Sequence, residues 1–357
     1  MMQLAPAGRQ LLDTLQEMVR EAGGCPEIDI ASLGFGRRET AAVAAMQADG
    51  RVGRVRLVAG LGTAILRQRE GRTGWDDMLG AFGADNVRAA LCHTKLVLVR
   101  GQRDLALLTS ANLNRNNRPE QYERADERSR DLKRFVDAVF KCCPPGLSRS
   151  GSLEAMRRVL DANPLDATDY PAPPSGAAVH ALCERGPALV LCHRFGMGSL
   201  LPVLGRIAGR GSTLDATTWA LSKEDAFAVG REAEWGWLSE VNVRVPARLG
   251  RRADGAKAHA AMQLAADCFS WSPSHAKVAV LEGPEARFTL TGCNFQLLDE
   301  LDIMVVRSDA ASAIGAREAL ASIPTEPPPE PPSDAEMAAA RKSRLAWQMG
   351  KTRSPTW

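Results

Sequence analysis

Two stretches of this chain share one pattern of chemically active residues, and this duplication constrains the fold more than any other feature. The first is LCHTKLVLVRGQRDLALLTSAN at 91–112, and the second is SHAKVAVLEGPEARFTLTGCN at 274–294. In each, an Asn lies 19 positions after the His and 17 after the Lys of a His-x-Lys motif. Chance seldom preserves such a triplet twice in one register. The triplets are His93, Lys95 and Asn112, and His275, Lys277 and Asn294.

Each copy also carries the same pattern of local structure. The His-x-Lys begins an apolar run, which is followed by a charged turn with Gly101 or Gly283 and by a second apolar run that ends at the Asn. Short apolar runs between turn residues predict two adjacent buried strands. Because residues i and i+2 of a strand share a face, we expect the His and Lys of each copy to project together. The Asn at the end of the next strand can join them.

These residues resemble the signature of the phospholipase D superfamily, in which H-x-K-x4-D is followed by a G/S-S/G-x-N turn. The turns here are TSAN at 109–112 and TGCN at 291–294. The resemblance covers residues 25–308 and implies an α/β fold of two halves, each a mixed sheet flanked by helices. In this family the halves form a pseudo-twofold pseudo-dimer with one shared active site. The segment TSANLNRNNRPEQYE also resembles phage- and prophage-encoded proteins of the superfamily.

The chain departs from that signature at the motif Asp. Arg100 stands there in the first copy and Glu282 in the second. Tyrosyl-DNA phosphodiesterases of the superfamily also lack this Asp and are active, so the departure is compatible with an enzyme. We expect the Arg100 cation to lower the pKa of a nearby His93 and to favour its neutral form. Glu282 is the residue that could orient His275.

A second carboxylate is implied by the resemblance alone. Glu123 follows Asn112 by 11 positions, where the family often carries a Glu that holds a catalytic His. After Asn294 no residue occupies the equivalent place, because Glu300 and Asp302 come earlier. Glu123 is therefore a supporting residue of the predicted site. An ordinary surface acid is the alternative for Glu123 and for Glu282.

The resemblance assigns a role to each member of the two triplets. His93 is the nucleophile that forms a phosphohistidine, and His275 is the acid that protonates the leaving oxygen and later activates water. The two lysines and the two asparagines stabilise the non-bridging phosphate oxygens. Ser110 is first a tight-turn residue and then a phosphate ligand. No cofactor is needed, and we expect the two imidazoles to face one another about 5 to 8 Å apart, as in-line attack requires.

Composition bounds the remaining possibilities. The chain has 357 residues, 45% of them hydrophobic, which is ample for a core. No run approaches the roughly 18 apolar residues of a membrane span, so a cytoplasmic location is expected, in the host if the chain is phage-encoded. The eight cysteines form no C-x-x-C pair, so we expect neither disulfides nor zinc. Because the net charge is only +3, local basic clusters must bind any nucleic acid. They are Arg115 with Arg118, Arg248 with Arg251 and Arg252, and the C-terminal tail.

The order of segments predicts two halves and a tail. The first half covers 1–143, a Pro- and Ser-containing linker covers 144–178, and the second half covers 179–323. A Pro-rich spacer, 324–333, precedes a basic tail at 334–357 that could touch nucleic acid or a protein partner. In the first half, 114–130 is expected to be a polar segment. The closing strand predicted at 301–306 has no clear counterpart there.

The function expected from these features is hydrolysis of a phosphodiester, most simply in nucleic acid, without a metal. The alternative is a phosphate- or nucleic-acid-binding protein, such as a phage DNA-processing or assembly component, in which turnover has been lost. A phospholipase is less favoured because the sequence shows no amphipathic membrane-docking helix. Binding to a membrane is not expected.

Overall fold

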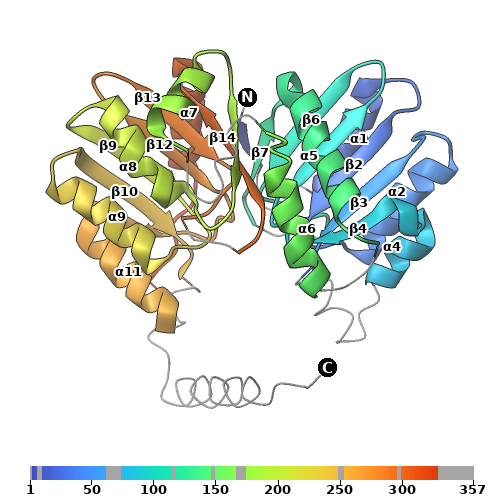
Figure 1. The fold of residues 1–357 in the computed structure, drawn as a ribbon. Helices are drawn as coiled ribbons and strands as arrows, with labels where there is room; N and C mark the ends of the chain where they lie inside the picture. The colour runs from blue at the N-terminus through green and yellow to red at the C-terminus, as the bar shows by residue number, and fades with distance from the viewer. Residues whose placement is uncertain are drawn as a thin grey trace.

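The computed structural model describes residues 2–5, 10–61, 74–114, 118–145, 149–165, 174–247, 253–295 and 299–328. Over these ranges the chain forms two α/β halves that lie side by side (Figure 1). Each half is built on a seven-stranded mixed sheet with helices packed against it. The predicted pseudo-dimeric α/β architecture is therefore confirmed.

The first half runs from the N-terminus to the helix that follows its last strand. Its elements are β1 (Met2–Ala5), α1 (Leu11–Ala22), β2 (Glu27–Ser32), α2 (Arg37–Ala48), β3 (Val55–Gly60), α4 (Gly74–Phe82), the 3-10 helix η1 (Ala84–Asn86), β4 (Val87–Ala90), β5 (Leu96–Arg100), β6 (Asp104–Thr109), β7 (Glu120–Arg124), the 3-10 helix η2 (Asp126–Arg128) and α5 (Ser129–Cys142).

Two further helices connect the first half to the second. The elements that follow are α6 (Arg149–Asp161), α7 (Gly176–Cys183), β8 (Ala188–Cys192), α8 (Met197–Ala208), β9 (Ser212–Thr217), α9 (Lys223–Glu234), β10 (Leu238–Val245), α11 (Ala253–Ala265), β11 (Cys268–Trp271), β12 (Val278–Glu282), β13 (Arg287–Thr291), β14 (Asp302–Arg307) and α12 (Ala310–Ala321).

The two sheets repeat one another strand for strand. Their orders are β1-β7-β6-β5-β2-β3-β4 and, from the equivalent edge, β8-β14-β13-β12-β9-β10-β11. In each sheet three neighbouring strands are parallel, β2 to β4 or β9 to β11, and every other neighbouring pair is antiparallel. The closing strand β14, for which the sequence shows no equally clear counterpart, is matched in the first half by β7.

The predicted polar segment 114–130 therefore contains a buried strand. Glu120, Gln121 and Glu123 of β7 are all at most 2% exposed although they are polar. An apolar periodicity cannot identify a strand whose buried side chains are polar. The partners of these side chains lie in the other half of the molecule, which the sequence order conceals.

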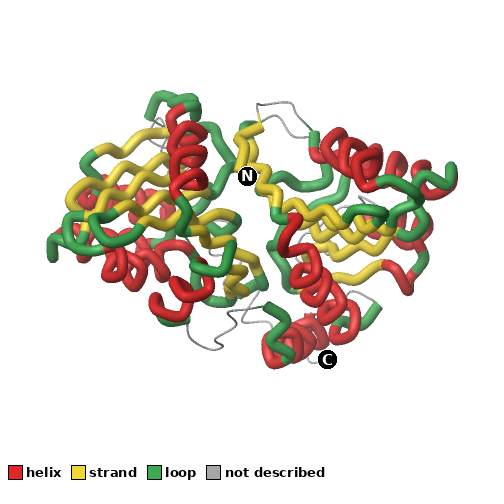
Figure 2. Tube along the Cα trace, turned by 90° about the horizontal axis from the view of Figure 1, so that it is seen from above, coloured by secondary structure: helices red, strands yellow, loops and turns green. Residues whose placement is uncertain are grey.

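Interlocking elements hold the two halves together. One apolar cluster unites residues on β2, β5 and α5 of the first half and on the connecting helix α6 with Leu189, Leu191, Ile303 and Val305 of β8 and β14. Another places Met2 of β1 against α12 and β12 of the second half. The N-terminal strand accordingly lies at the junction between the halves (Figure 2). Burial of apolar surface from both halves in shared clusters disfavours their separation.

Helix α6 lies within the segment that the sequence predicts as a linker. Its residues Ala155, Met156, Val159 and Leu160 are buried in the cluster shared with α5, β8 and β14. The predicted boundaries at 143, 178 and 323 remain expectations. The basic tail and half of the Pro-rich spacer, 329–333, lie outside the described residues.

A glycine stands in the hairpin turn that follows the His-x-Lys strand of each half. A Cβ on Gly101 would lie 2.5 Å from the carbonyl oxygen of Gly23, and a Cβ on Gly283 would lie 2.2 Å from that of Ala208. Both carbonyls belong to the chain at the end of the helix packed beneath the hairpin, α1 or α8. Only glycine permits this approach, because backbone carbonyls have little room to move.

Replacement of this glycine should destabilise the fold. We expect Gly283→Ala to lower the free energy of unfolding by about 1 to 3 kcal/mol, because the added methyl overlaps the Ala208 carbonyl. Gly315→Ala is the matched control, since Gly315 lies within α12 and a Cβ there meets nothing within 4 Å. Gly315→Ala should raise the free energy of unfolding by about 0.5 to 1 kcal/mol. Urea unfolding measures the change in both variants, and equal changes in the free energy of unfolding would contradict the close packing at Gly283.

Candidate active site

The two His-x-Lys segments lie at the junction of the halves, and each is bound there by the opposite half. His93 donates its backbone N–H to the carbonyl of Leu301 at 2.7 Å, and Leu301 donates to Leu91 at 2.8 Å. The backbone N–H of His275 donates to the carbonyl of Pro119 at 3.0 Å. Leu301 and Pro119 directly precede β14 and β7. The start of each closing strand therefore positions the histidine of the other half.

Each imidazole is oriented by a carboxylate from the opposite half. His93 Nδ1 lies 2.9 Å from Asp302 Oδ2, and His275 Nδ1 lies 2.9 Å from Glu120 Oε2 and 3.0 Å from Oε1. A neutral ring that donates its Nδ1 proton to a carboxylate has its lone pair on Nε2. Both rings retain 13% side-chain exposure, so a ligand can reach them. This arrangement suits Nε2 as nucleophile or base.

Burial keeps both imidazoles uncharged near neutral pH. Burial, with a further contribution from Lys95, lowers the pKa of His93 to about 4, although Asp302 opposes the shift. Burial and Lys277 lower the pKa of His275 to about 3 against the opposing effect of Glu120. Each ring is also affected by the lysine of the other half. The four side chains therefore form one electrostatically coupled cluster.

The two lysines place positive charge in this buried cluster. Lys95 Nζ donates to the carbonyl of its neighbour His93 at 2.7 Å and lies 3.3 Å from the Nε2 atom of that ring. Lys277 is fully buried, and its Nζ has no hydrogen-bond partner among the described residues. Burial, and then the proximity of Lys277, lowers the pKa of Lys95 to about 7. Burial lowers the pKa of Lys277 as well. An unpaired buried ammonium group is costly, so the site is suited to an anion.

The carboxylates offset this charge. Burial alone would raise the pKa of Asp302, but His93, Lys95 and Lys277 hold it below its ordinary value. Burial also opposes ionisation of Glu120, whose pKa is nevertheless lowered by hydrogen bonds from His275 and Ser110. Both carboxylates are therefore ionised at neutral pH. Two basic and two acidic side chains therefore lie buried around the imidazoles.

Matching hydroxyl groups anchor the turns that carry the two asparagines. Ser32 Oγ accepts from the backbone N–H of Leu113 at 3.0 Å, and Thr218 Oγ1 accepts from that of Phe295 at 3.0 Å. Each hydroxyl also donates to the carbonyl two residues further along its own loop. Asn112 Oδ1 lies 3.4 Å from Ser32 Oγ, and Asn294 Oδ1 accepts from the Ala220 N–H at 3.1 Å. Fixing the oxygen leaves the amide hydrogens of each Asn for another acceptor.

The predicted supporting residue Ser110 positions a carboxylate. Its hydroxyl donates to Glu120 and accepts from the backbone N–H of Gln121 at 2.8 Å. The second half has Gly292 in the equivalent place, with φ of 98° and a Cβ position 2.4 Å from the Ile303 carbonyl. Ser110 is therefore a positioning residue in this structure. Its role as a phosphate ligand remains a prediction.

The three charged residues expected to support the histidines do not contact them. Arg100 pairs with Glu27 at 2.9 Å and Asp29 at 3.2 Å, and Glu282 pairs with Arg287 and Arg317. Both lie at the far end of their strands, and five residues of strand span roughly 16 Å. The expectation that Arg100 lowers the pKa of His93 is corrected by this placement.

Glu123 is likewise occupied elsewhere. It accepts from Arg307 Nε at 2.9 Å and from the hydroxyl of Thr291. Its function here is to join β7 to β13 and β14 across the junction. The carboxylate that holds His275 is Glu120, and Asp302 plays that part for His93. The sequence contained the signal, because Glu120 follows Asn112 by eight positions and Asp302 follows Asn294 by eight.

The basic clusters are only partly within the described residues. Arg118 is described, and its guanidinium lies 4.6 Å from the ring centroid of Trp219. Arg115, Arg248, Arg251, Arg252 and the tail lie outside the described residues. Among the residues that are described, no helix is long and apolar enough to cross a membrane. The same residues contain no group of three His, Cys, Asp or Glu that could hold a metal.

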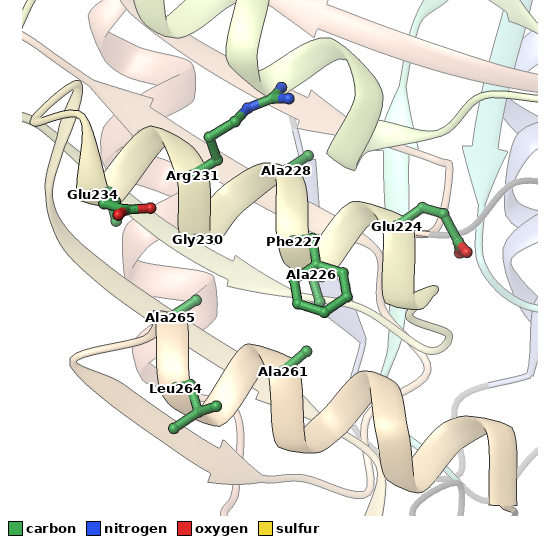
Figure 3. A pocket seen from close by; sticks show the side chains of 11 residues that line it. Glu224, Ala226, Phe227, Ala228, Gly230, Arg231, Glu234, Ala261, Leu264 and Ala265 are labelled. Atoms are coloured by element: carbon green, nitrogen blue, oxygen red, sulfur yellow. The ribbon is translucent and has the colours of Figure 1, made fainter.

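A surface groove of the second half lies apart from these residues. It lies between α9 and α11, has a volume of about 650 Å³, and is lined by Phe227, Leu264 and several alanines (Figure 3). Its charged residues, Glu224, Arg231 and Glu234, lie along α9 (Figure 3). No histidine or lysine of the duplicated motif lines it. The histidine cluster is therefore the candidate active site.

Comparisons with known proteins identify the fold. No protein-family model matches the sequence, and a comparison with curated proteins finds no match. The structure of phosphatidylserine synthase from Haemophilus influenzae Rd KW20 aligns over 97% of this chain and 93% of its own, with a TM-score of 0.57 and 9% identity. Polyphosphate kinase from Porphyromonas gingivalis aligns over 94% of this chain, with a TM-score of 0.50 and 13% identity. This chain spans about half, 54%, of that kinase.

A shorter protein aligns with only part of the chain. Nuc from Salmonella typhimurium, a phospholipase D family member, covers 39% of this chain and 98% of its own, with a TM-score of 0.30 and 12% identity. The two alignments over nearly the whole chain show that it shares the fold of these two enzymes. The fold implied by the resemblance of the duplicated motif is confirmed at this level.

The neutral state of the two histidines can be tested directly. In the NMR spectrum of histidine-labelled protein, assigned with His93→Asn and His275→Asn, neither ring should protonate between about pH 7.5 and pH 5.5, because its pKa is about 4 or about 3. Unfolded histidines bind protons near pH 6.5. The free energy of unfolding should therefore fall as the pH drops from about 6.5 towards 4. A midpoint near pH 6.5 for either ring in the free protein would contradict the burial described.

Proposed function

We propose that this chain is a metal-independent phosphodiesterase that acts on nucleic acid through a phosphohistidine intermediate. One observation carries the proposal: two imidazoles, each oriented by a carboxylate of the opposite half, share a buried cluster with two lysines, and Lys277 Nζ has no hydrogen-bond partner among the described residues. The oxygens of a phosphodiester would accept hydrogen bonds from these lysines. The lysines then stabilise the negative charge that develops on the non-bridging oxygens.

The proposal gives the two histidines different roles in a two-step displacement, as the resemblance implies. In the first step His93 Nε2 attacks phosphorus, the bond to the leaving oxygen breaks, and His275 Nε2 gives that oxygen a proton. In the second step His275 takes a proton from water, whose oxygen attacks phosphorus and releases His93. Asp302 stabilises the positive charge that the first ring acquires, and Glu120 stabilises the protonated second ring.

The acid of the first step must gain its proton when substrate binds. In the free protein the pKa of His275 is about 3, so the ring is neutral. A bound phosphodiester adds a negative charge beside the ring and raises its pKa. Binding should therefore be accompanied by proton uptake. The low pKa of His275 also favours the second candidate function, a phosphate-binding protein without turnover, because the free site holds no imidazolium that could protonate a leaving group.

The structural neighbours support phosphoryl chemistry. Polyphosphate kinase and phosphatidylserine synthase are both named for reactions of phosphate anhydrides or esters. Nucleic acid is proposed as the substrate here because an arginine and a tryptophan lie beside His275, and such residues bind phosphates and bases. A phospholipid is the competing diester.

A direct assay separates these substrates. The full chain in EDTA should hydrolyse labelled single-stranded DNA, double-stranded DNA or RNA, and it should leave phospholipid vesicles intact. Acid-labile label trapped during turnover should map to His93. Hydrolysis of phospholipid vesicles but of no nucleic acid would show that the substrate is a phospholipid. Binding of oligonucleotides without cleavage would favour the second candidate function, a phosphate-binding protein without turnover. Product formation without any phosphohistidine would reject covalent catalysis.

The crossed carboxylates should be needed for turnover. We expect Asp302→Asn and Glu120→Gln each to lower kcat by about 10² to 10⁴, because the neutral amide no longer fixes the ring or stabilises its charge. The control is Glu282→Gln, whose carboxylate pairs with Arg287 and Arg317. It should change kcat less than about threefold. Equal losses of kcat in all three variants would show that the contacts of His93 with Asp302 and of His275 with Glu120 have no special role.

A further inference from the structure

The pseudo-symmetry of the two halves shows where they differ beside the site. His93 and His275, Asn112 and Asn294, and Glu120 and Asp302 are all separated by 182 positions. The same separation relates Arg118 to Glu300, which come two positions before Glu120 and Asp302. Equivalent positions next to the two histidine–carboxylate pairs therefore carry a basic side chain, Arg118, and an acidic one, Glu300.

A second difference lies in the loops that anchor the asparagines. Ser32 and Thr218 make the same hydrogen bonds in the two halves, so the residues that follow them, Leu33 and Trp219, are equivalent. The Trp219 ring stands perpendicular to that of His275, with 4.4 Å between the ring centroids. An aliphatic side chain occupies the corresponding place in the first half. The Trp219 indole thus has no aromatic counterpart at the equivalent position of the first half.

Arg118 and Trp219 form one unit on that side. The guanidinium of Arg118 lies over the Trp219 ring, and within the described part of the chain it makes no ion pair. Trp219 is half-buried, and the N–H of the next residue, Ala220, donates to Asn294. The loop that carries the indole is thereby tied to the catalytic cluster. An arginine free of carboxylates beside an aromatic ring can serve both a phosphate and a base.

The His93 side has the opposite character. Glu300 is half-buried there, and burial, together with the nearby Asp302, raises its pKa, although Lys95 opposes the shift. Asp299 lies beside it and is ion-paired with Arg194 at 2.9 Å. The position equivalent to Arg118 therefore carries an acidic side chain, which does not bind the phosphates of a polyanionic chain.

We propose that the site is polarised, and that the continuing single strand of a nucleic-acid substrate lies on the His275 side, with its phosphate on Arg118 and a base stacked on Trp219. This inference rests on the proposed function and adds the direction and the strandedness of the substrate. When the phosphate engages Arg118, the guanidinium moves off the indole face and the base takes its place. A base within a duplex is already stacked on its neighbours and is unavailable to the indole.

The test compares two oligonucleotides with the same number of phosphates. One is single-stranded oligothymidylate, and the other has abasic tetrahydrofuran residues throughout. In EDTA we expect the full chain to prefer the first in kcat/KM by roughly tenfold or more, as stacking on an aromatic side chain provides. Trp219→Ala should bring this ratio close to one, and Trp219→Phe should keep most of it. The control Leu33→Ala, at the equivalent position, should keep the wild-type ratio.

Arg118 makes a separate and measurable contribution. Arg118→Ala should weaken binding of both oligonucleotides alike and reduce the slope of log affinity against log salt by about 0.7, the value for one contact with a single strand. Arg118→Lys should restore that slope. An unchanged slope in Arg118→Ala would overturn the assignment of the phosphate contact.

The outcomes distinguish this inference from the proposed function. If the protein cleaves both oligonucleotides and Trp219→Ala leaves the ratio unchanged, the Trp219 assignment fails and the phosphodiesterase stands. If the protein binds both oligonucleotides without cleaving them, the preference for oligothymidylate over the abasic strand is measured as a ratio of Kd values. An unchanged Kd ratio in Trp219→Ala would again contradict the Trp219 assignment. If the wild type neither binds nor cleaves either oligonucleotide, both proposals fail.

Discussion

The two crossed hydrogen bonds between histidine and carboxylate are the interaction on which the site depends. His93 is held by Asp302, and His275 is held by Glu120, each from the opposite half. Neither half contains a complete catalytic group, so the shared apolar clusters that join the halves also assemble the chemistry. The carboxylates offset the two buried lysines, and Lys277 Nζ, which has no hydrogen-bond partner among the described residues, can donate to an anionic ligand.

Much of this organisation could be predicted from the sequence, because the duplication repeats residue types as well as spacing. The matched His, Lys and Asn identified two equivalent units, and the flanking apolar runs identified β5, β6, β12 and β13. The pseudo-dimeric α/β fold followed from the resemblance that these residues carry. Gly101 and Gly283 were visible as turn residues, and the structure adds that a helix end leaves no room for a Cβ.

The sequence did not reveal how the halves meet. Glu120 and Asp302 lie at the same distance from the two asparagines, yet β7 is rich in buried polar residues and gives no apolar strand pattern. Their partners are more than 150 positions away, so no local rule connects them. Arg100 and Glu282 occupy the family's motif position, but a strand carries them to the end remote from the histidines.

The central claim is that one anion site is built from both halves. Calorimetric titration of the full chain with tungstate, an oxyanion similar in shape to phosphate, tests it most directly. The account predicts one tungstate per chain, with affinity at least about tenfold weaker in Lys95→Met and in Lys277→Met alike, because each removes a charged hydrogen-bond donor. Two tungstates per chain, or full affinity in either folded variant, would contradict a single shared site.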